Sequence, residues 1–157
     1  MLQRSSTSAA FASFMVLVFS CLLFSFSGKM GGDKFEIYLN KKLAIQQYVT
    51  MNDPVKSLQL DQNNLNDQVE VYYSHCGKTG TGRSISIRDA QHRILKEWHF
   101  QDTPDAKTSM ACNVKDIIGL QKLRNTTNLS LYYTAHELPA GRLLAILTTD
   151  DTLKTAP

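Results

Sequence analysis

The sequence lacks a strong excess of charge of either sign. Its 157 residues include 17 Lys and Arg against 14 Asp and Glu. Proteins that bind nucleic acid or an anionic membrane surface through electrostatics carry a clear basic excess, usually gathered in one patch. The adjacent basic pair Lys41-Lys42 suits a turn better than such a patch. We therefore expect no nucleic-acid partner.

Motifs that identify common catalytic and metal centres are also missing. The chain has no Gly-x-Ser-x-Gly turn, no His-Glu-x-x-His and no Cys-x-x-Cys. Gly77-Lys78-Thr79 looks like the end of a phosphate-binding loop, but Tyr72 stands where that loop needs a glycine, and a strand is predicted to follow. The histidines are scattered, at His75, His92, His99 and His136. We therefore predict no catalytic residues, no metal and no cofactor.

Only one long apolar run is present, and it lies near the N-terminus. Residues 11–26 are apolar apart from interspersed serines. The run is shorter than the about 20 residues that cross a bilayer comfortably, and Ser25-Phe26-Ser27 places small residues at the −3 and −1 positions of a signal-peptidase cut before Gly28. We predict a signal peptide at 1–27, a single domain at 28–150 and a flexible tail at 151–157. The protein would then be exported (periplasmic, cell-surface or secreted), with no stable membrane span after cleavage. An uncleaved N-terminal anchor is the alternative.

Cysteine is scarce, and the predicted cleavage leaves two, Cys76 and Cys112. In an oxidising compartment two remaining thiols usually pair. A Cys76–Cys112 disulfide would stabilise the fold by about 3–4 kcal/mol in the chain-entropy model. The rival hypothesis is a small hydrolase or thiol enzyme that uses His75 and Cys76, for which Cys76 must be free. A metal site formed by these residues lacks the spacing typical of zinc ligands.

Past the apolar run, the sequence alternates with the period of β-strands. Phe35, Ile37 and Leu39 share one face, Asn40-Lys41 indicates a turn, and a second strand follows at 43–49. Further short strands are predicted at 57–60, 69–73, 85–87, 94–100, 129–133 and 143–147.

One short helix is predicted near 114–123, because Val114, Ile117 and Ile118 recur at helical spacing. About seven or eight short strands with one crossover helix favour an all-β, mainly antiparallel β-sandwich. A small β-barrel is the alternative. The alternation predicts a core that contains the single tryptophan as its anchor: Phe35, Ile37, Ile45, Val69, Val71, Ile85, Ile87, Trp98, Leu131 and Leu147.

Two similar segments, 69–74 and 129–134, each contain a Tyr-Tyr pair. Alternation directs Tyr72 and Tyr132 outward, and on neighbouring strands they would form an aromatic contact surface. Cross-strand stabilisation explains the same pattern. Lys78 and Arg83 lie on a glycine-rich segment that we expect to be an exposed, flexible loop, where binding residues are common.

The sequence thus favours a structural or binding module that holds a protein or a glycan, using Tyr72, Tyr132, Lys78 and Arg83 as the candidate surface. A small hydrolase or thiol enzyme is the alternative. Asn125 and Asn128 each begin an N-glycosylation pattern, and the sequence does not assign a modification to either.

Overall fold

The computed structural model describes residues 32–50, 52–63, 65–103 and 108–149. The predicted signal peptide at 1–27 and the predicted tail at 151–157 lie outside these ranges and remain predictions. Within the described ranges, no helix has the length and apolar character needed to span a bilayer.

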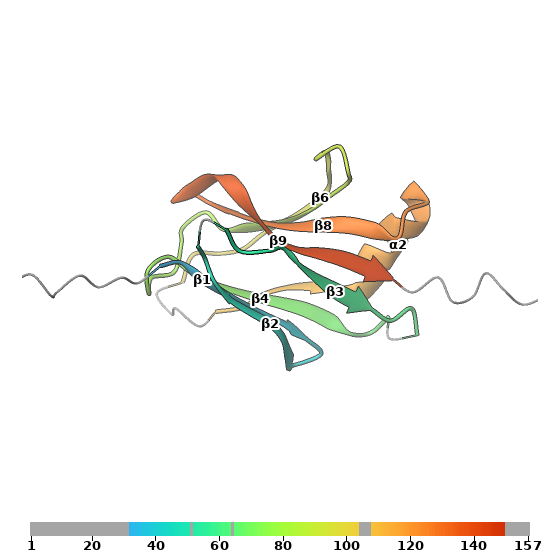
Figure 1. Ribbon diagram of the computed structural model, residues 1–157, viewed down its shortest axis with the longest axis horizontal. Coiled ribbons are helices and arrows are strands. Elements are labelled where there is room, and N and C mark those ends of the chain that lie inside the picture. The colour runs from blue at the N-terminus through green and yellow to red at the C-terminus, as the bar shows by residue number, and fades with distance from the viewer. Residues whose placement is uncertain (1–31, 51, 64, 104–107, 150–157) are drawn as a thin grey trace, which may run out of the picture. The chain divides into compact units, whose positions relative to one another are not determined.

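The described chain forms two mainly antiparallel sheets and one short helix, which confirms the predicted all-β sandwich (Figure 1). The four-stranded sheet has the order β2-β1-β4-β7. Its strands are β1 (Lys34–Leu39), β2 (Lys42–Tyr48), β4 (Gln68–Ser74) and β7 (Met110–Asn113).

The five-stranded sheet has the order β3-β9-β8-β5-β6, in which β3 and β9 pair in parallel. Its strands are β3 (Lys56–Leu60), β5 (Ser84–Arg88), β6 (Ile94–His99), β8 (Asn128–Ala135) and β9 (Leu138–Thr149). Both sheets are open. The edge strands are β2 and β7 in the four-stranded sheet, and β3 and β6 in the five-stranded sheet, so the barrel alternative is wrong.

The core lies between the two sheets and follows the predicted alternation. All the predicted core residues except Trp98 are at most 4% exposed. Trp98 is only half-buried, because β6 is an edge strand and its inward face is incompletely covered. The Nζ atom of Lys96 lies 4.9 Å from the centroid of the Trp98 ring and covers part of it. Trp98 is therefore a residue of the core's margin rather than its anchor.

Two turns contain residues with positive φ, the left-handed conformation that glycine and asparagine adopt most readily. Asn40 and Lys41 have φ of 49° and 64°, and they form the predicted two-residue turn between β1 and β2. Cys76 and Gly77 have φ of 50° and 88°, and the backbone groups of His75 and Lys78 exchange hydrogen bonds of 2.7 and 3.0 Å across them. Positive φ at both central positions is typical of a tight type I′ hairpin. The predicted flexible loop thus begins with a defined turn.

Helix α2 (Val114–Arg124) connects the two sheets, as the predicted crossover near 114–123 requires. It buries Val114, Ile117 and Ile118 against the core. It ends at Asn125, which adopts the left-handed conformation common at helix C-termini. Asp116 forms an ion pair of 2.7 Å with Lys96 of β6.

The predicted disulfide is wrong, because Cys76 and Cys112 are both free. Cys112 of β7 pairs with Val69 near the start of β4, whereas Cys76 follows the end of that strand. A strand rises about 3.3 Å per residue, so the two cysteines lie roughly 20 Å apart along β4. A disulfide needs Cα atoms within about 4.4–6.8 Å.

The two thiols should react very differently. We expect iodoacetamide to alkylate Cys76 in the folded protein, since Cys76 is exposed. Cys112 should stay unmodified until the protein unfolds, because burial raises the pKa of its thiol to about 12. Peptide mapping by mass spectrometry, after labelling with and without denaturant, measures the alkylated fraction of each cysteine. A Cys76–Cys112 cross-linked peptide in an unreduced digest would contradict the structure.

Candidate functional site

The two outward tyrosines predicted to share a surface lie on different sheets. Tyr72 belongs to β4 of the four-stranded sheet and Tyr132 to β8 of the five-stranded sheet, so that part of the prediction is wrong. The two similar segments are instead partners across the core. Their inward tyrosines, Tyr73 and Tyr133, stack with centroids 4.2 Å apart and ring planes 12° from parallel.

The two basic residues predicted on the loop also separate. Lys78 is exposed, as expected, but Arg83 is only 2% exposed. The Arg83 guanidinium donates hydrogen bonds to the carbonyl oxygens of Gln101 at 2.8 Å and Thr108 at 3.1 Å. Arg83 thus holds together two points of the connection between β6 and β7, and it is not available to a ligand.

The outer face of the four-stranded sheet carries an aromatic surface that the sequence prediction only partly identified. We call it the tyrosine face, and its members are Tyr38, Leu43, Tyr48 and Tyr72. The register of the sheet aligns them: Tyr38 of β1 lies opposite Leu43, and Glu36, two residues before Tyr38, lies opposite Tyr72. Tyr48 is 64% exposed and Leu43 is 50% exposed, whereas Tyr38 and Tyr72 are half-buried.

Charged side chains fix the tyrosine face in one arrangement. Tyr38 and Tyr72 meet edge to face with centroids 5.4 Å apart, and the Nζ atom of Lys34 lies 5.4 Å from the centroid of Tyr48. Glu36 pairs with Lys34 at 2.7 Å and accepts a hydrogen bond from the Tyr38 hydroxyl at 3.0 Å. The hydrogen bond from Lys34 holds the pKa of Glu36 below its ordinary value. Lys34, Glu36 and the Tyr38 hydroxyl are therefore already paired within the protein.

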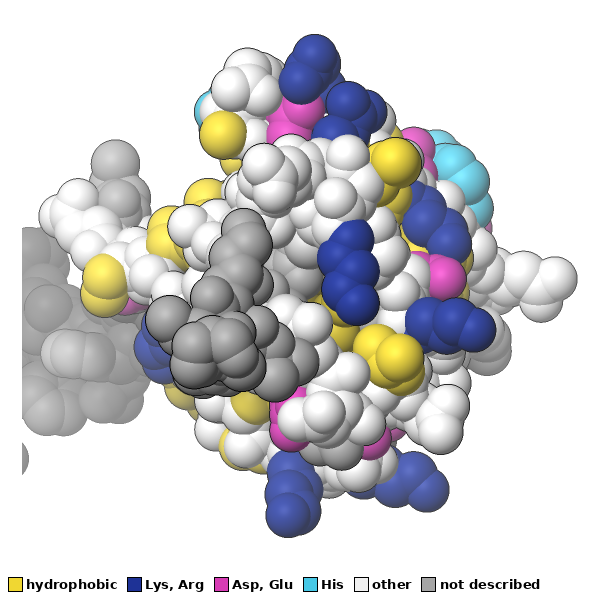
Figure 2. Space-filling model, turned by 90° about the vertical axis from the view of Figure 1, so that its right-hand side faces the viewer, with side chains coloured by type: hydrophobic (Ala, Val, Ile, Leu, Met, Phe, Trp, Pro, Cys, Tyr) yellow, Lys and Arg dark blue, Asp and Glu magenta, His cyan; other side chains and the backbone are white. Residues whose placement is uncertain are grey.

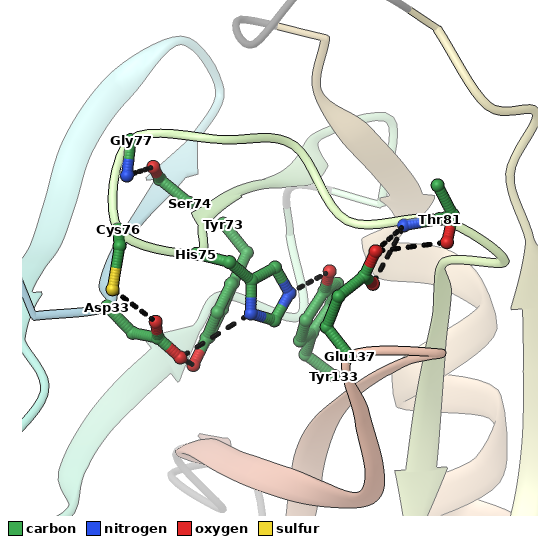
Figure 3. A network of polar contacts seen from close by, with 9 residues as sticks. All are labelled: Asp33, Tyr73, Ser74, His75, Cys76, Gly77, Thr81, Tyr133 and Glu137. Carbon is green, nitrogen blue, oxygen red and sulfur yellow. Dashed lines mark hydrogen bonds and ion pairs between the residues drawn. The ribbon is translucent and has the colours of Figure 1, made fainter.

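A separate polar network lies where the hairpin after β4 meets the β8–β9 hairpin (Figure 3). The Tyr73 hydroxyl donates to Asp33 at 2.8 Å, and the Nδ1 atom of His75 lies 3.5 Å from the same carboxylate. The Nε2 atom of His75 contacts the Tyr133 hydroxyl at 3.0 Å. Gly80 passes so close that a Cβ atom there would lie 2.6 Å from that hydroxyl.

The order Asp33–His75–Tyr133 resembles the relay in which a histidine activates a hydroxyl nucleophile. Tyr133, however, is 0% exposed, and burial raises the pKa of its hydroxyl. A substrate cannot reach this oxygen in the structure. In the structure, the network links Asp33, the hairpin after β4 and strand β8.

The geometry also gives no support to the thiol-enzyme alternative. The Sγ atom of Cys76 lies 3.8 Å from Asp33, the same carboxylate that His75 contacts. Both ring nitrogens of His75 are engaged, one by Asp33 and the other by Tyr133. His75 is thus not placed to take a proton from the Cys76 thiol.

The outer face of the five-stranded sheet offers a smaller cluster around Tyr132. The Arg88 guanidinium lies 4.1 Å from the centroid of the Tyr132 ring, and the Tyr132 hydroxyl contacts His92 at 3.3 Å. Arg88 thus occupies one face of this ring. Tyr132 is consequently a poorer candidate for ligand stacking than the tyrosines of the other sheet.

The side of the molecule that bears α2 and the end of β9 has a polar groove of about 530 Å³. Its lining residues are Gln62, Ile118, Gln121, Lys122, Asn125, Thr126, Thr127 and Thr149. Figure 2 shows that Lys and Arg side chains stand singly or in small groups on this side, with acidic, polar and hydrophobic side chains between them. Asn125 and Asn128 of the two glycosylation patterns are both exposed.

Within the described ranges, no cluster of three or more His, Cys, Asp or Glu side chains is arranged to hold a metal ion. Comparison of the chain with protein-family models, with curated proteins and with solved structures finds no match. Function is therefore argued from the site itself.

Proposed function

We propose that the protein is an exported binding module that recognises a partner protein through the tyrosine face. One observation carries this proposal: Tyr48 and Leu43, two of the most exposed large hydrophobic side chains described, flank the Tyr38–Tyr72 pair on one sheet surface. Exposed aromatic side chains in a contiguous group are typical of protein interfaces. Export is supported by the apolar run at 11–26 and the small residues before Gly28.

The contacts on this face favour a protein over a glycan as the partner. Sugars are held by free hydrogen-bond groups as well as by stacking, yet Glu36 is already bonded by Lys34, Tyr38 and Gln46. The exposed side chains of Tyr48 and Leu43 offer ring and aliphatic surface that a protein side chain can bury, and Glu70, opposite Tyr38, adds a carboxylate at the margin.

Recognition is expected through the face rather than the edge of the sheet. The edge strand β2 has a backbone carbonyl, that of Gln46, which accepts a hydrogen bond from Lys56 of β3 at 3.1 Å. A lysine at an edge strand is a common means of preventing strand addition.

The proposal is tested by photo-crosslinking in the host. A benzophenone amino acid replaces Tyr48 or Leu43, and the matched control replaces Tyr132 on the opposite sheet. We expect the same partner protein to be captured from both test positions. It should not be captured from position 132 in the control. With the purified partner, Tyr48→Ala combined with Tyr72→Ala should weaken binding at least tenfold, as truncation of interface tyrosines does.

Two results would overturn the proposal. One is a captured protein that binds the Tyr48→Ala, Tyr72→Ala variant as tightly as the unchanged chain. The other is capture from Tyr132 with equal yield, which would show that contact at the tyrosine face is not selective. Saturable binding of a glycan that depends on Tyr48 and Tyr72 would replace the protein partner with a sugar.

A further inference from the structure

The Glu70 side chain, at the margin of the tyrosine face, has no partner among the described residues. Its neighbours Val69 and Val71 in β4 are buried, so Glu70 points outward on the same face as Tyr72. Glu70 is half-buried. Within the described ranges, no ion pair or hydrogen bond includes its carboxylate, whereas Glu36 on the same face is bonded to Lys34. Carboxylates that are partly removed from water are normally paired.

Glu70 adjoins two aromatic rings and one small residue. The register of the sheet pairs it with Tyr38 of β1 on one side and with Ala111 of β7 on the other. Opposite residues of antiparallel strands have Cβ atoms about 4.5–5.5 Å apart, and Tyr72 follows two residues along β4, so both rings lie beside the carboxylate. Because Ala111 has only a methyl group, its side chain covers little of the carboxylate. The Tyr38–Tyr72 contact holds the two rings in a fixed geometry.

The rings of Tyr38 and Tyr72 also lack a cation, unlike other aromatic rings near the surface. Tyr48, Trp98 and Tyr132 each have a Lys or Arg side chain within 5.4 Å of the ring centroid. In the part of the chain that the structure describes, no such contact involves Tyr38 or Tyr72. The face of an aromatic ring attracts positive charge. The carboxylate and the two rings therefore favour the same kind of group, a cation.

We infer that Glu70, Tyr38 and Tyr72 bind an arginine side chain of the partner protein. A guanidinium group donates two parallel hydrogen bonds to a carboxylate and stacks on an aromatic ring, and here both kinds of group are adjacent. The ammonium group of lysine is a compact, strongly hydrated charge and does not stack in this way. The inference rests on the proposed function, since it names the side chain that the partner presents to the tyrosine face.

The first test uses NMR of the full chain and N-acetyl-L-arginine amide as the probe. The probe should produce saturable shifts of the Glu70 amide signal and of the ring signals of Tyr38 and Tyr72. The citrulline counterpart has the same length but an uncharged urea group, and it should bind about tenfold more weakly because it loses the charge-assisted hydrogen bonds. The lysine counterpart should also bind more weakly than the arginine probe.

A conservative variant identifies the carboxylate. Glu70→Gln keeps the shape of the side chain and removes its charge, so it should weaken binding of the arginine probe about tenfold. The matched control is Glu97→Gln, which removes a carboxylate from β6 of the five-stranded sheet and should leave binding unchanged. Unaltered binding by Glu70→Gln, equal binding of the citrulline probe, or no saturable shift with the arginine probe would overturn the inference. Equal binding of the lysine probe would overturn the preference for arginine.

The captured partner protein separates this inference from the proposed function. Glu70→Gln should weaken binding of the partner about tenfold. If the partner depends on Tyr48 and Tyr72 but binds Glu70→Gln as tightly as the unchanged chain, the arginine is refuted and the tyrosine face remains the interface. If the arginine probe binds at Glu70 but no protein is captured from the tyrosine face, the proposed function fails and the guanidinium site remains.

Discussion

Replacing Arg83 with alanine is expected to lower the free energy of unfolding by about 3–5 kcal/mol. The side chain is among the largest that are fully buried, so its loss creates a cavity. The substitution also removes the donors that satisfy the carbonyl oxygens of Gln101 and Thr108. Removal of the buried charge recovers some desolvation energy and so favours the variant. The loss of packing and hydrogen bonds is expected to be larger, because the two carbonyl oxygens stay buried without their donor.

Chemical denaturation followed by circular dichroism measures the effect. The matched control is Arg124→Ala, which removes an arginine from the exposed last turn of α2 and should change stability by less than about 0.5 kcal/mol. Arg83→Lys should fall between the two, since it keeps the charge but loses the two-pronged donor. Equal stability of Arg83→Ala and Arg124→Ala would refute the role assigned to Arg83.

The position of Arg83 illustrates what local sequence could not predict. A charged residue in a glycine-rich segment is usually exposed, and nothing nearby in the sequence indicates that carbonyls of Gln101 and Thr108 converge on it. The same holds for Arg142, which faces inward because of its register with Tyr133. Burial of these cations depends on contacts between distant segments.

The strands themselves were predictable, because alternation within a strand is a local property. Phe35, Ile37, Val69 and Val71 are buried where the pattern placed them. Assignment of strands to sheets is not local, which is why the prediction that Tyr72 and Tyr132 share one surface is wrong. The register between neighbouring strands is not local either, and it places Cys112 opposite Val69 at the far end of β4 from Cys76.

Part of the tyrosine face could have been predicted from the alternation of residues 34–39. In the alternating segment 34–39, the inward positions Phe35 and Ile37 imply that Tyr38 points outward. The turn at Asn40-Lys41 then brings β2 beside β1, so that the outward residues of the hairpin share the face of Tyr38. The addition of Tyr72 required knowledge that β4 pairs with the other side of β1.

Replacing Tyr133 with alanine should also be severely destabilising, by about 3–5 kcal/mol. Tyr133 is 0% exposed, and its ring stacks on Tyr73 from the opposite sheet. Stacked aromatic pairs contribute about 0.5–1.5 kcal/mol beyond the area that they bury. The truncation would therefore remove packing within the five-stranded sheet and the aromatic contact that joins it to the four-stranded sheet.

Tyr133→Phe separates the hydroxyl from the ring. It keeps the stack on Tyr73 but leaves the Nε2 atom of His75 without its partner, so we expect a loss of about 1–2 kcal/mol. A double-mutant cycle of Tyr133→Phe with His75→Ala, measured by chemical denaturation, should give a coupling energy of at least about 0.5 kcal/mol. If Tyr133→Phe proved as costly as Tyr133→Ala, the hydroxyl network would outweigh the stack as the link between the sheets. If the cycle gave no coupling, the His75–Tyr133 contact would contribute nothing to stability, and the ring stack alone would account for the effect of Tyr133→Ala.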